Sequence, residues 1–160
     1  MYKEIQGDLI ELAKQGMFDV ITHGCNCMCT MGAGIAPQMA KAFACHAYPL
    51  EELSTKGDIN KLGQIDYKYY NLYEFEDSPK KILAVVNSYT QYSPAPWLKP
   101  LDYEALTLCL RKINHVFRGK HVGLPQIGAG LAGGDWDRIK QIIQTELKDC
   151  EVTVVIYKKS

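Results

Sequence analysis

The sequence predicts an α/β domain in which a mixed sheet of about six strands is covered by helices on both faces. Apolar runs alternate with helical patterns along the 160 residues, as layered α/β domains require. The run Lys81–Val86 is nearly all apolar, which indicates a strand buried on both faces. Leu106, Cys109, Ile113 and Val116 recur at helical spacing. The length fits one domain over residues 1–160, with a core of its own.

The strands are predicted from apolar and β-branched runs bounded by turn residues. Phe18–His23 is the clearest such run, His121–Leu124 stops at Pro125, and Glu151–Tyr157 carries valines at alternate positions. In chain order, the predicted strands are Tyr2–Gln6, Phe18–His23, Gln64–Lys68, Tyr69–Phe75, Lys81–Val86, His121–Leu124 and Glu151–Tyr157.

The helices are predicted from apolar residues that recur on one side. Pro37 is tolerated near the start of its helix, because the first turn needs no hydrogen bond from that nitrogen. Ile139, Ile142, Ile143 and Leu147 mark an apolar helical face. The predicted helices are Ile35–Ala44, Pro49–Thr55, Leu101–Phe117 and Trp136–Lys148.

The overall charge excludes some classes of partner. The formal net charge is zero and the isoelectric point is near 6.9, so a basic face that binds duplex nucleic acid is not expected. No apolar run approaches the roughly 18 residues of a membrane span. The chain opens with polar residues rather than a secretory signal, so its six cysteines are expected to be reduced thiols in the cytoplasm. A monomer is compatible with these features.

Two glycine-rich loops follow predicted strands and lead into later helices. The first is Gly24–Gly34 and the second is Gly128–Gly134. Ligands of open α/β sheets bind beyond the carboxyl ends of the strands, where glycine lets backbone N–H groups face an anion. Two such loops facing each other would hold a diphosphate without a lysine. The alternative is that the glycines simply make turns, and neither loop matches the P-loop or a full dinucleotide-binding fingerprint.

Cysteines at alternate positions in the first loop raise the question of a metal or a thiol catalyst. Zinc sites prefer a second cysteine pair downstream of the first, and the other cysteines of this chain are scattered. No metal is therefore expected. A cysteine nucleophile activated by His23 is conceivable, but small, half-buried loop residues are the preferred interpretation. The three cysteines are Cys25, Cys27 and Cys29.

Four segments carry a resemblance to a known family. They resemble the macro domain in their order and spacing over nearly the whole chain, from about Tyr2 to Tyr157. The similar branch contains ADP-ribose 1''-phosphate phosphatases and lysine-using ADP-ribosyl glycohydrolases. The segments are Gly7-Asp8-Leu9, His23-Gly24-Cys25-Asn26, Met31-Gly32-Ala33-Gly34-Ile35-Ala36 and Leu124-Pro125-Gln126-Ile127-Gly128-Ala129-Gly130-Leu131-Ala132-Gly133-Gly134-Asp135-Trp136.

The resemblance implies a three-layer α/β/α sandwich with a mixed central sheet that binds ADP-ribose or ADP-ribose 1''-phosphate and needs no cofactor. Asp8 would accept a hydrogen bond from the adenine amino group beside the Leu9 backbone, although a helix cap also suits Asp8. Asn26 would contact the distal ribose, and Tyr157 would pack on adenine or be an ordinary exposed strand residue. The two phosphate loops would be Gly32, Ala33, Gly34 and Ile35, and Gly128, Ala129, Gly130, Leu131 and Ala132.

The resemblance also implies an activity, with two departures. The lysine of the glycohydrolases is missing from Val86–Gln91, and Ala132 replaces their acid. A phosphatase that releases phosphate from ADP-ribose 1''-phosphate is therefore the leading hypothesis. His23 would act as nucleophile or base, or be structural, assisted by Asn26. Asp135 would orient water or His23, or cap the following helix. A glycohydrolase acting on protein or nucleic acid, and a reader without catalysis, remain alternatives.

Overall fold

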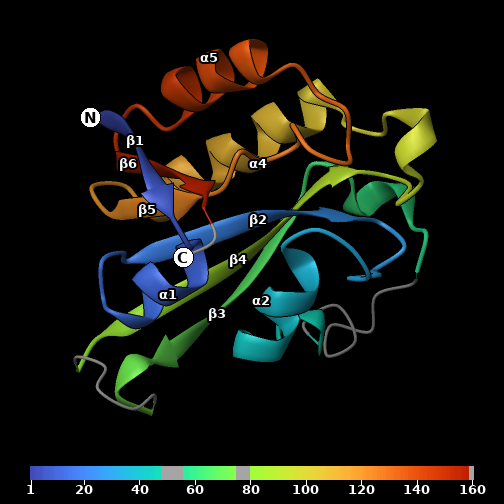
Figure 1. Cartoon of the computed structure of the whole chain (residues 1–160). Coiled ribbons are helices and arrows are strands. Elements are labelled where there is room, and N and C mark those ends of the chain that lie inside the picture. The colour runs from blue at the N-terminus through green and yellow to red at the C-terminus, as the bar shows by residue number, and fades with distance from the viewer. Residues whose placement is uncertain (48–55, 75–79, 159–160) are drawn as a thin grey trace.

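The computed structural model describes residues 1–47, 56–74 and 80–158 and forms three layers (Figure 1). A six-stranded sheet in the order β1-β6-β5-β2-β4-β3 lies between two helical layers. The strands are β1 (Tyr2–Gly7), β2 (Val20–Asn26), β3 (Ile65–Asn71), β4 (Ile82–Gln91), β5 (His121–Leu124) and β6 (Glu151–Tyr157). The helices are α1 (Leu9–Lys14), α2 (Ala36–Phe43), α4 (Tyr103–Val116) and α5 (Trp136–Glu146).

The sheet is mixed, as the sequence predicts. Strands β1, β6, β5, β2 and β4 pair in parallel, and β3 joins the edge antiparallel to β4. The central strand β2 is buried on both faces, which explains its apolar and β-branched composition. The parallel arrangement brings the carboxyl ends of β2, β4, β5 and β6 to the same edge of the sheet.

Two hydrophobic clusters fill the spaces on either side of the sheet. Side chains from α4 and α5 pack against Val20, Val86 and Val122 on one face. Side chains from α1 and α2 pack against Ile21 and Val85 on the other. Successive residues of β2 therefore point to opposite layers, which later decides where His23 lies.

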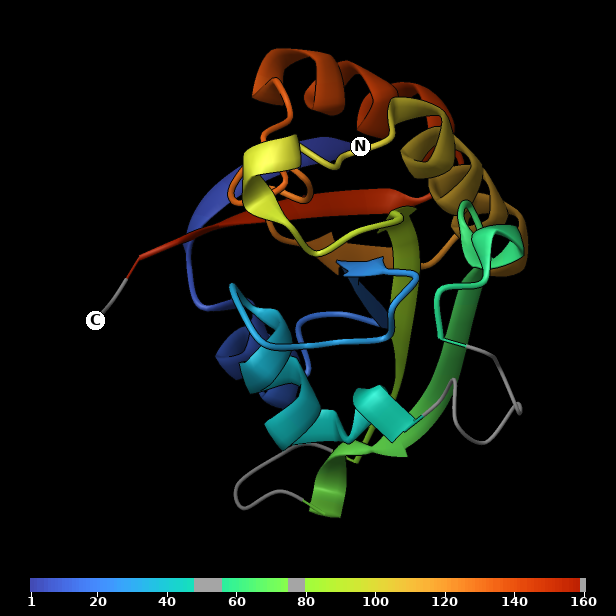
Figure 2. The same cartoon turned by 90° about the vertical axis from the view of Figure 1, so that its right-hand side faces the viewer.

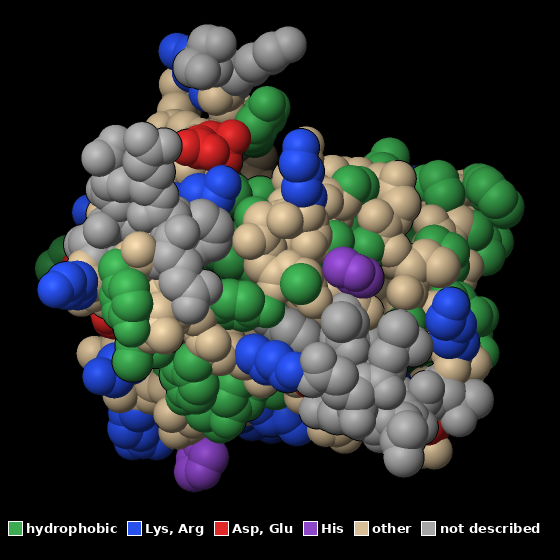
Figure 3. Space-filling view, turned by 90° about the horizontal axis from the view of Figure 1, so that it is seen from below, with side chains coloured by type: hydrophobic (Ala, Val, Ile, Leu, Met, Phe, Trp, Pro, Cys, Tyr) green, Lys and Arg blue, Asp and Glu red, His purple; other side chains and the backbone are tan. Residues whose placement is uncertain are grey.

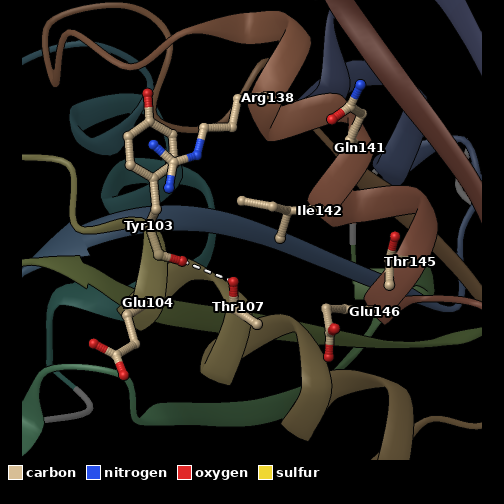
Figure 4. A pocket seen from close by; sticks show the side chains of 8 residues that line it. All are labelled: Tyr103, Glu104, Thr107, Arg138, Gln141, Ile142, Thr145 and Glu146. Atoms are coloured by element: carbon tan, nitrogen blue, oxygen red, sulfur yellow. Dashed lines mark hydrogen bonds between the residues drawn. The ribbon is translucent and has the colours of Figure 1, made fainter.

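Helices α4 and α5 lie side by side across a groove of about 470 Å³ (Figure 4). The Arg138 guanidinium stacks on the ring of Tyr103 at 3.8 Å, and Arg111 pairs with Glu146 at 2.8 Å. The Tyr103 hydroxyl also accepts a hydrogen bond from the backbone N–H of Asp135 at 2.8 Å. The two contacts of Tyr103 hold the start of α5, and with it the end of the second glycine loop, whereas the Arg111–Glu146 pair holds the other end of the helix.

The structure corrects several predicted elements; the strand predicted to end at Val86, for example, runs on to Gln91 as β4. The predicted strands Gln64–Lys68 and Tyr69–Phe75 are one strand, β3, because β4 offers pairing partners along all of Ile65–Asn71. Strand β2 continues through Asn26, so the first loop starts later than Gly24. Helix α1, for which no element was predicted, begins after Asp8. The predicted helix Pro49–Thr55 lies outside the described residues.

Charged side chains are spread over the surface. On the face seen in Figure 3, the Lys and Arg side chains of the described residues stand apart from one another instead of forming a continuous stripe. Within the described ranges, no helix is both long and apolar enough to span a bilayer.

Candidate functional site

The first loop leaves β2 at Asn26 and leads into α2. The Asn26 side chain holds this loop, since its Nδ2 donates to the Thr30 carbonyl at 2.9 Å and its Oδ1 accepts from the Thr30 backbone N–H at 3.3 Å. Gly34 then adopts a φ of +66°, a left-handed conformation that favours glycine. The loop consequently reaches α2 along a path that Asn26 and Gly34 determine together.

The second loop leaves β5 at Leu124 and is folded back on itself. The backbone N–H of Gly134 donates to the Gly128 carbonyl at 2.8 Å. A Cβ at Gly128 would lie 2.8 Å from Leu101, and one at Gly134 would lie 2.3 Å from the same side chain. Gly128 also has a left-handed φ of +78°, and a Cβ at Gly134 would lie 2.7 Å from the Gly128 carbonyl oxygen, so the backbone itself favours glycine at both positions.

The two loops face each other across one hollow of about 330 Å³, which we call the cleft. Nearly all predicted phosphate-loop residues line it, and Gln91 at the end of β4 joins them. Those lining the cleft are Asn26, Gly32, Ala33, Gly34, Ile35, Gly128, Gly130, Leu131 and Ala132. Ala129 is not among them and packs against the core instead.

A second hollow of about 680 Å³, here called the Asp8 pocket, adjoins the cleft. Gly34, Ile35 and Pro125 line both spaces, so the two are neighbours that share part of one wall. The Asp8 pocket also contains Asp8 and Tyr157 and has apolar walls that include Leu9, Ile10, Ala42 and Val155. Its charged wall residues are Asp8, Glu11, Lys14 and Lys41. Apolar walls with a carboxylate among them suit a flat, weakly polar ring that carries a hydrogen-bond donor.

The two carboxylate oxygens of Asp8 differ in their contacts. Its Oδ1 caps α1 by accepting hydrogen bonds from the N–H groups of Ile10 at 3.0 Å and Glu11 at 3.2 Å. No described residue donates to Oδ2 in the structure, and Asp8 lines the pocket. The cap therefore orients the carboxylate and leaves one oxygen for a ligand.

His23 lies in the interior, on the α2 side of the sheet, and is not part of the cleft wall. The Asn87 Nδ2 donates to the Cys45 carbonyl at 2.9 Å, so Asn87 Oδ1 is oriented to accept from His23 Nε2 at 2.8 Å. That arrangement assigns the proton to Nε2 and leaves the buried Nδ1 without a partner. Burial lowers the pKa of His23 from 6.5 to about 4, so the ring is neutral at pH 7.

The remaining predicted residues lie outside the cleft. Asp135 caps α5 by accepting a hydrogen bond from the Asp137 N–H at 3.1 Å, and it does not line the cleft. Cys25 and Cys27 are buried, and burial raises the pKa of both thiols. Among the described residues, no group of three or more His, Cys, Asp or Glu side chains is placed to hold a metal ion.

Several cleft residues had no clear signal in the sequence. Thr30 and Pro94 line the cleft but belong to no recognisable motif. Gln91 does have a signal in the sequence, because it follows the apolar central strand, and in the structure it ends β4 paired with Asn26. The side chains on the described cleft wall are amides, hydroxyls and apolar groups, with no Asp, Glu, Lys, Arg or His among them.

One comparison identifies the family. An uncharacterized 17.5 kDa protein of Enterobacteria phage T4, from the tk-vs intergenic region, is 36% identical over 158 residues, covering 96% of this chain and 94% of the phage protein. The chain belongs to the same family as this phage protein. No family model matches the sequence.

Solved structures show that this family member has the macrodomain fold. The macrodomain of Thermus aquaticus DarG aligns with 99% of each chain at a TM-score of 0.65 and 22% identity. Thermosipho africanus DarTG in complex with ADP-ribose aligns over 99% of this chain and 43% of its own, at a TM-score of 0.70 and 18% identity. At these identities, the likeness concerns the fold.

Proposed function

We propose that this macrodomain-fold protein binds ADP-ribose, with adenosine in the Asp8 pocket and the diphosphate between the two glycine loops. The observation that carries the proposal is that the cleft and the Asp8 pocket adjoin, with Gly34, Ile35 and Pro125 in the walls of both. Backbone N–H groups in the glycine loops suit a diphosphate, since they hold an anion without a basic side chain. The ADP-ribose present in the Thermosipho africanus DarTG complex, which shares the fold, supports this choice of ligand.

Calorimetric titration with ADP-ribose tests the proposal, and Asp8→Asn makes the test specific. Asparagine caps a helix as well as aspartate does, so α1 is expected to persist. Its amide would place a donor against the adenine amino group and weaken ADP-ribose binding about tenfold. The hypoxanthine analogue of ADP-ribose has a carbonyl at that position and should bind Asp8→Asn better than it binds the wild type. Failure of the wild type to bind ADP-ribose would refute the proposal.

We also propose that the distal end of the cleft hydrolyses ADP-ribose 1''-phosphate. Asn26, Thr30 and Gln91 line the cleft and are absent from the wall of the Asp8 pocket. These groups can hold a phosphate ester and stabilise charge that develops on it, while water attacks phosphorus and the bond to the sugar oxygen breaks. The described wall offers no lysine nucleophile, which disfavours the glycohydrolase route. His23 would support β2 from behind the cleft rather than react.

Release of phosphate from ADP-ribose 1''-phosphate in EDTA tests the activity. We expect slow turnover that changes little between about pH 7 and pH 9, because the described wall residues do not titrate there and a phosphate ester with a pKa near 6 is already dianionic. Asn26→Asp, which is isosteric but negatively charged, should lower turnover about 100-fold by repelling the substrate. Ligand binding without phosphate release would indicate a reader of ADP-ribose that has no catalytic activity. Release of ADP-ribose from modified protein or DNA would favour the glycohydrolase instead.

The role of His23 can be separated in the same assay. Phosphate release retained by a folded His23→Gln variant would give His23 a structural role. Loss of phosphate release in this variant, with ADP-ribose binding intact, would show that His23 has a catalytic role.

A further inference from the structure

A group of exposed apolar residues lies in two segments that border the cleft and do not line the Asp8 pocket. It consists of Pro94, Trp97 and Leu98 in the connection between β4 and α4, and Leu131 in the second loop; we call it the apolar rim. Trp97 is 81% exposed, Leu98 63% and Leu131 57%. Single exposed apolar side chains are common on protein surfaces, but a group of them beside a cleft is typical of a surface that meets a ligand or a partner.

Two of the four rim residues belong to the cleft wall, and the other two follow one of them closely along the chain. Pro94 and Leu131 line the cleft directly, and Trp97 follows Pro94 by three residues in the short turn η4 (Pro96–Leu98). The segment that carries η4 is attached to the second loop, since the Leu101 N–H donates to the Ala132 carbonyl at 3.2 Å. A Cβ at Gly133 would lie only 2.7 Å from Lys99 Cγ, which shows how closely the two segments pack. Figure 2 shows η4 in front of this loop.

The direction of the bound ligand follows from the proposed function, on which this inference rests. With adenosine in the Asp8 pocket and the diphosphate at Gly34, the distal ribose reaches the part of the cleft formed by Asn26, Gln91 and Pro94. A group attached to the C1'' atom of that ribose must leave the cleft on this side. The apolar rim is the surface that it meets.

We propose that Trp97 selects ligands in which C1'' of the distal ribose carries a planar, unsaturated ring. The indole offers a broad face on which a ring can stack, and its rim neighbours Pro94, Leu98 and Leu131 are apolar and offer no side-chain hydrogen bond. Residues 93–101 contain a single charged side chain, Lys99, which packs against Gly133. A small polar substituent gains nothing from this surface, whereas a flat ring buries its face on it.

Three ligands test this selection by calorimetry with the full chain: ADP-ribose, its 1''-O-methyl glycoside and its 1''-O-phenyl glycoside. The phenyl glycoside is expected to bind about tenfold more tightly than the methyl glycoside, a difference of about 1.4 kcal/mol. Trp97→Ala should abolish that difference and change the affinity for ADP-ribose by less than about twofold. Trp97→Phe should keep most of it, because phenylalanine retains a stacking face.

Tyr69→Ala is the matched control, since Tyr69 is another exposed aromatic residue, 62% exposed, on the edge strand β3. It should leave all three affinities unchanged. Quenching of tryptophan fluorescence by the phenyl glycoside, absent in Trp97→Ala although Trp136 remains, would place the ring at Trp97. Equal binding of the two glycosides, or a preference that survives in Trp97→Ala, would overturn the inference while ADP-ribose binding stood. Absence of ADP-ribose binding would instead remove the proposed function, and the inference with it.

Discussion

Gly34→Asp is expected to lower the affinity for ADP-ribose at least about 100-fold, because it places a negative charge and a side chain where the diphosphate should lie. Gly34 lines both the cleft and the Asp8 pocket, and a Cβ built on it meets no atom within 4 Å. The new side chain would therefore project into open space at the junction of the two hollows. Titration calorimetry with ADP-ribose measures the loss.

The fold should survive this change. Aspartate is among the residues that tolerate a left-handed conformation, at a cost of about 1–2 kcal/mol. Helix α2 starts two residues later, at Ala36, and has neither a side-chain cap nor an acidic residue in its first turn, so a carboxylate there offsets part of that cost. We expect the melting temperature to fall by only a few degrees.

Gly119→Asp is the matched control for Gly34→Asp. Gly119 also has a left-handed φ, +80°, and its Cβ would likewise meet no atom within 4 Å, but it lies between α4 and β5 and lines neither hollow. The stability of the Gly119→Asp variant should fall about as much as that of Gly34→Asp, while its ADP-ribose binding is unchanged. Equal loss of binding in both variants, or normal binding by Gly34→Asp, would contradict the placement of the diphosphate.

Acid should destabilise this protein through His23. The pKa of His23 is about 4 in the folded chain and 6.5 as its ordinary value, so between these values the unfolded chain binds the proton and the folded chain does not. The part of the folding stability that depends on a neutral His23 is present in full above about pH 6.5 and is lost as the pH falls toward 4. The loss amounts to about 3 kcal/mol of the free energy of unfolding. Urea unfolding at a series of pH values measures it.

The contribution of His23 is isolated by comparing variants, since carboxylates also respond to acid. Asp19 and Glu4, for example, have pKa values lowered by hydrogen bonds and nearby lysines, with burial opposing both shifts. Between pH 7 and pH 4, the free energy of unfolding of His23→Gln should fall by about 3 kcal/mol less than that of the wild type. His115→Gln, which changes an exposed histidine of α4, should keep the wild-type slope. Equal slopes in all three proteins would mean that His23 is protonated without unfolding.

The alternation of strands and helices could be predicted from the sequence, because it depends on neighbouring residues. Strand β5 and strand β6 agree with their predicted ranges, and α5 begins at the predicted residue. The helix that Pro37 enters and the turn that Gly34 requires are also local properties. The single strand β3 was missed, because its continuity depends on the length of β4 rather than on its own residues.

The sequence by itself determined the layered α/β class and the two glycine loops, since periodicity and glycine act over a few residues. Only the tertiary structure decided that the loops share one cleft, because Leu101, far from Gly128 along the chain, sets the path of the second loop. It also decided that His23 shares the face of Ile21, toward α2, while Asn26 reaches the cleft. Alternation along a strand tells which side chains share a face, but long-range packing determines which face meets the ligand.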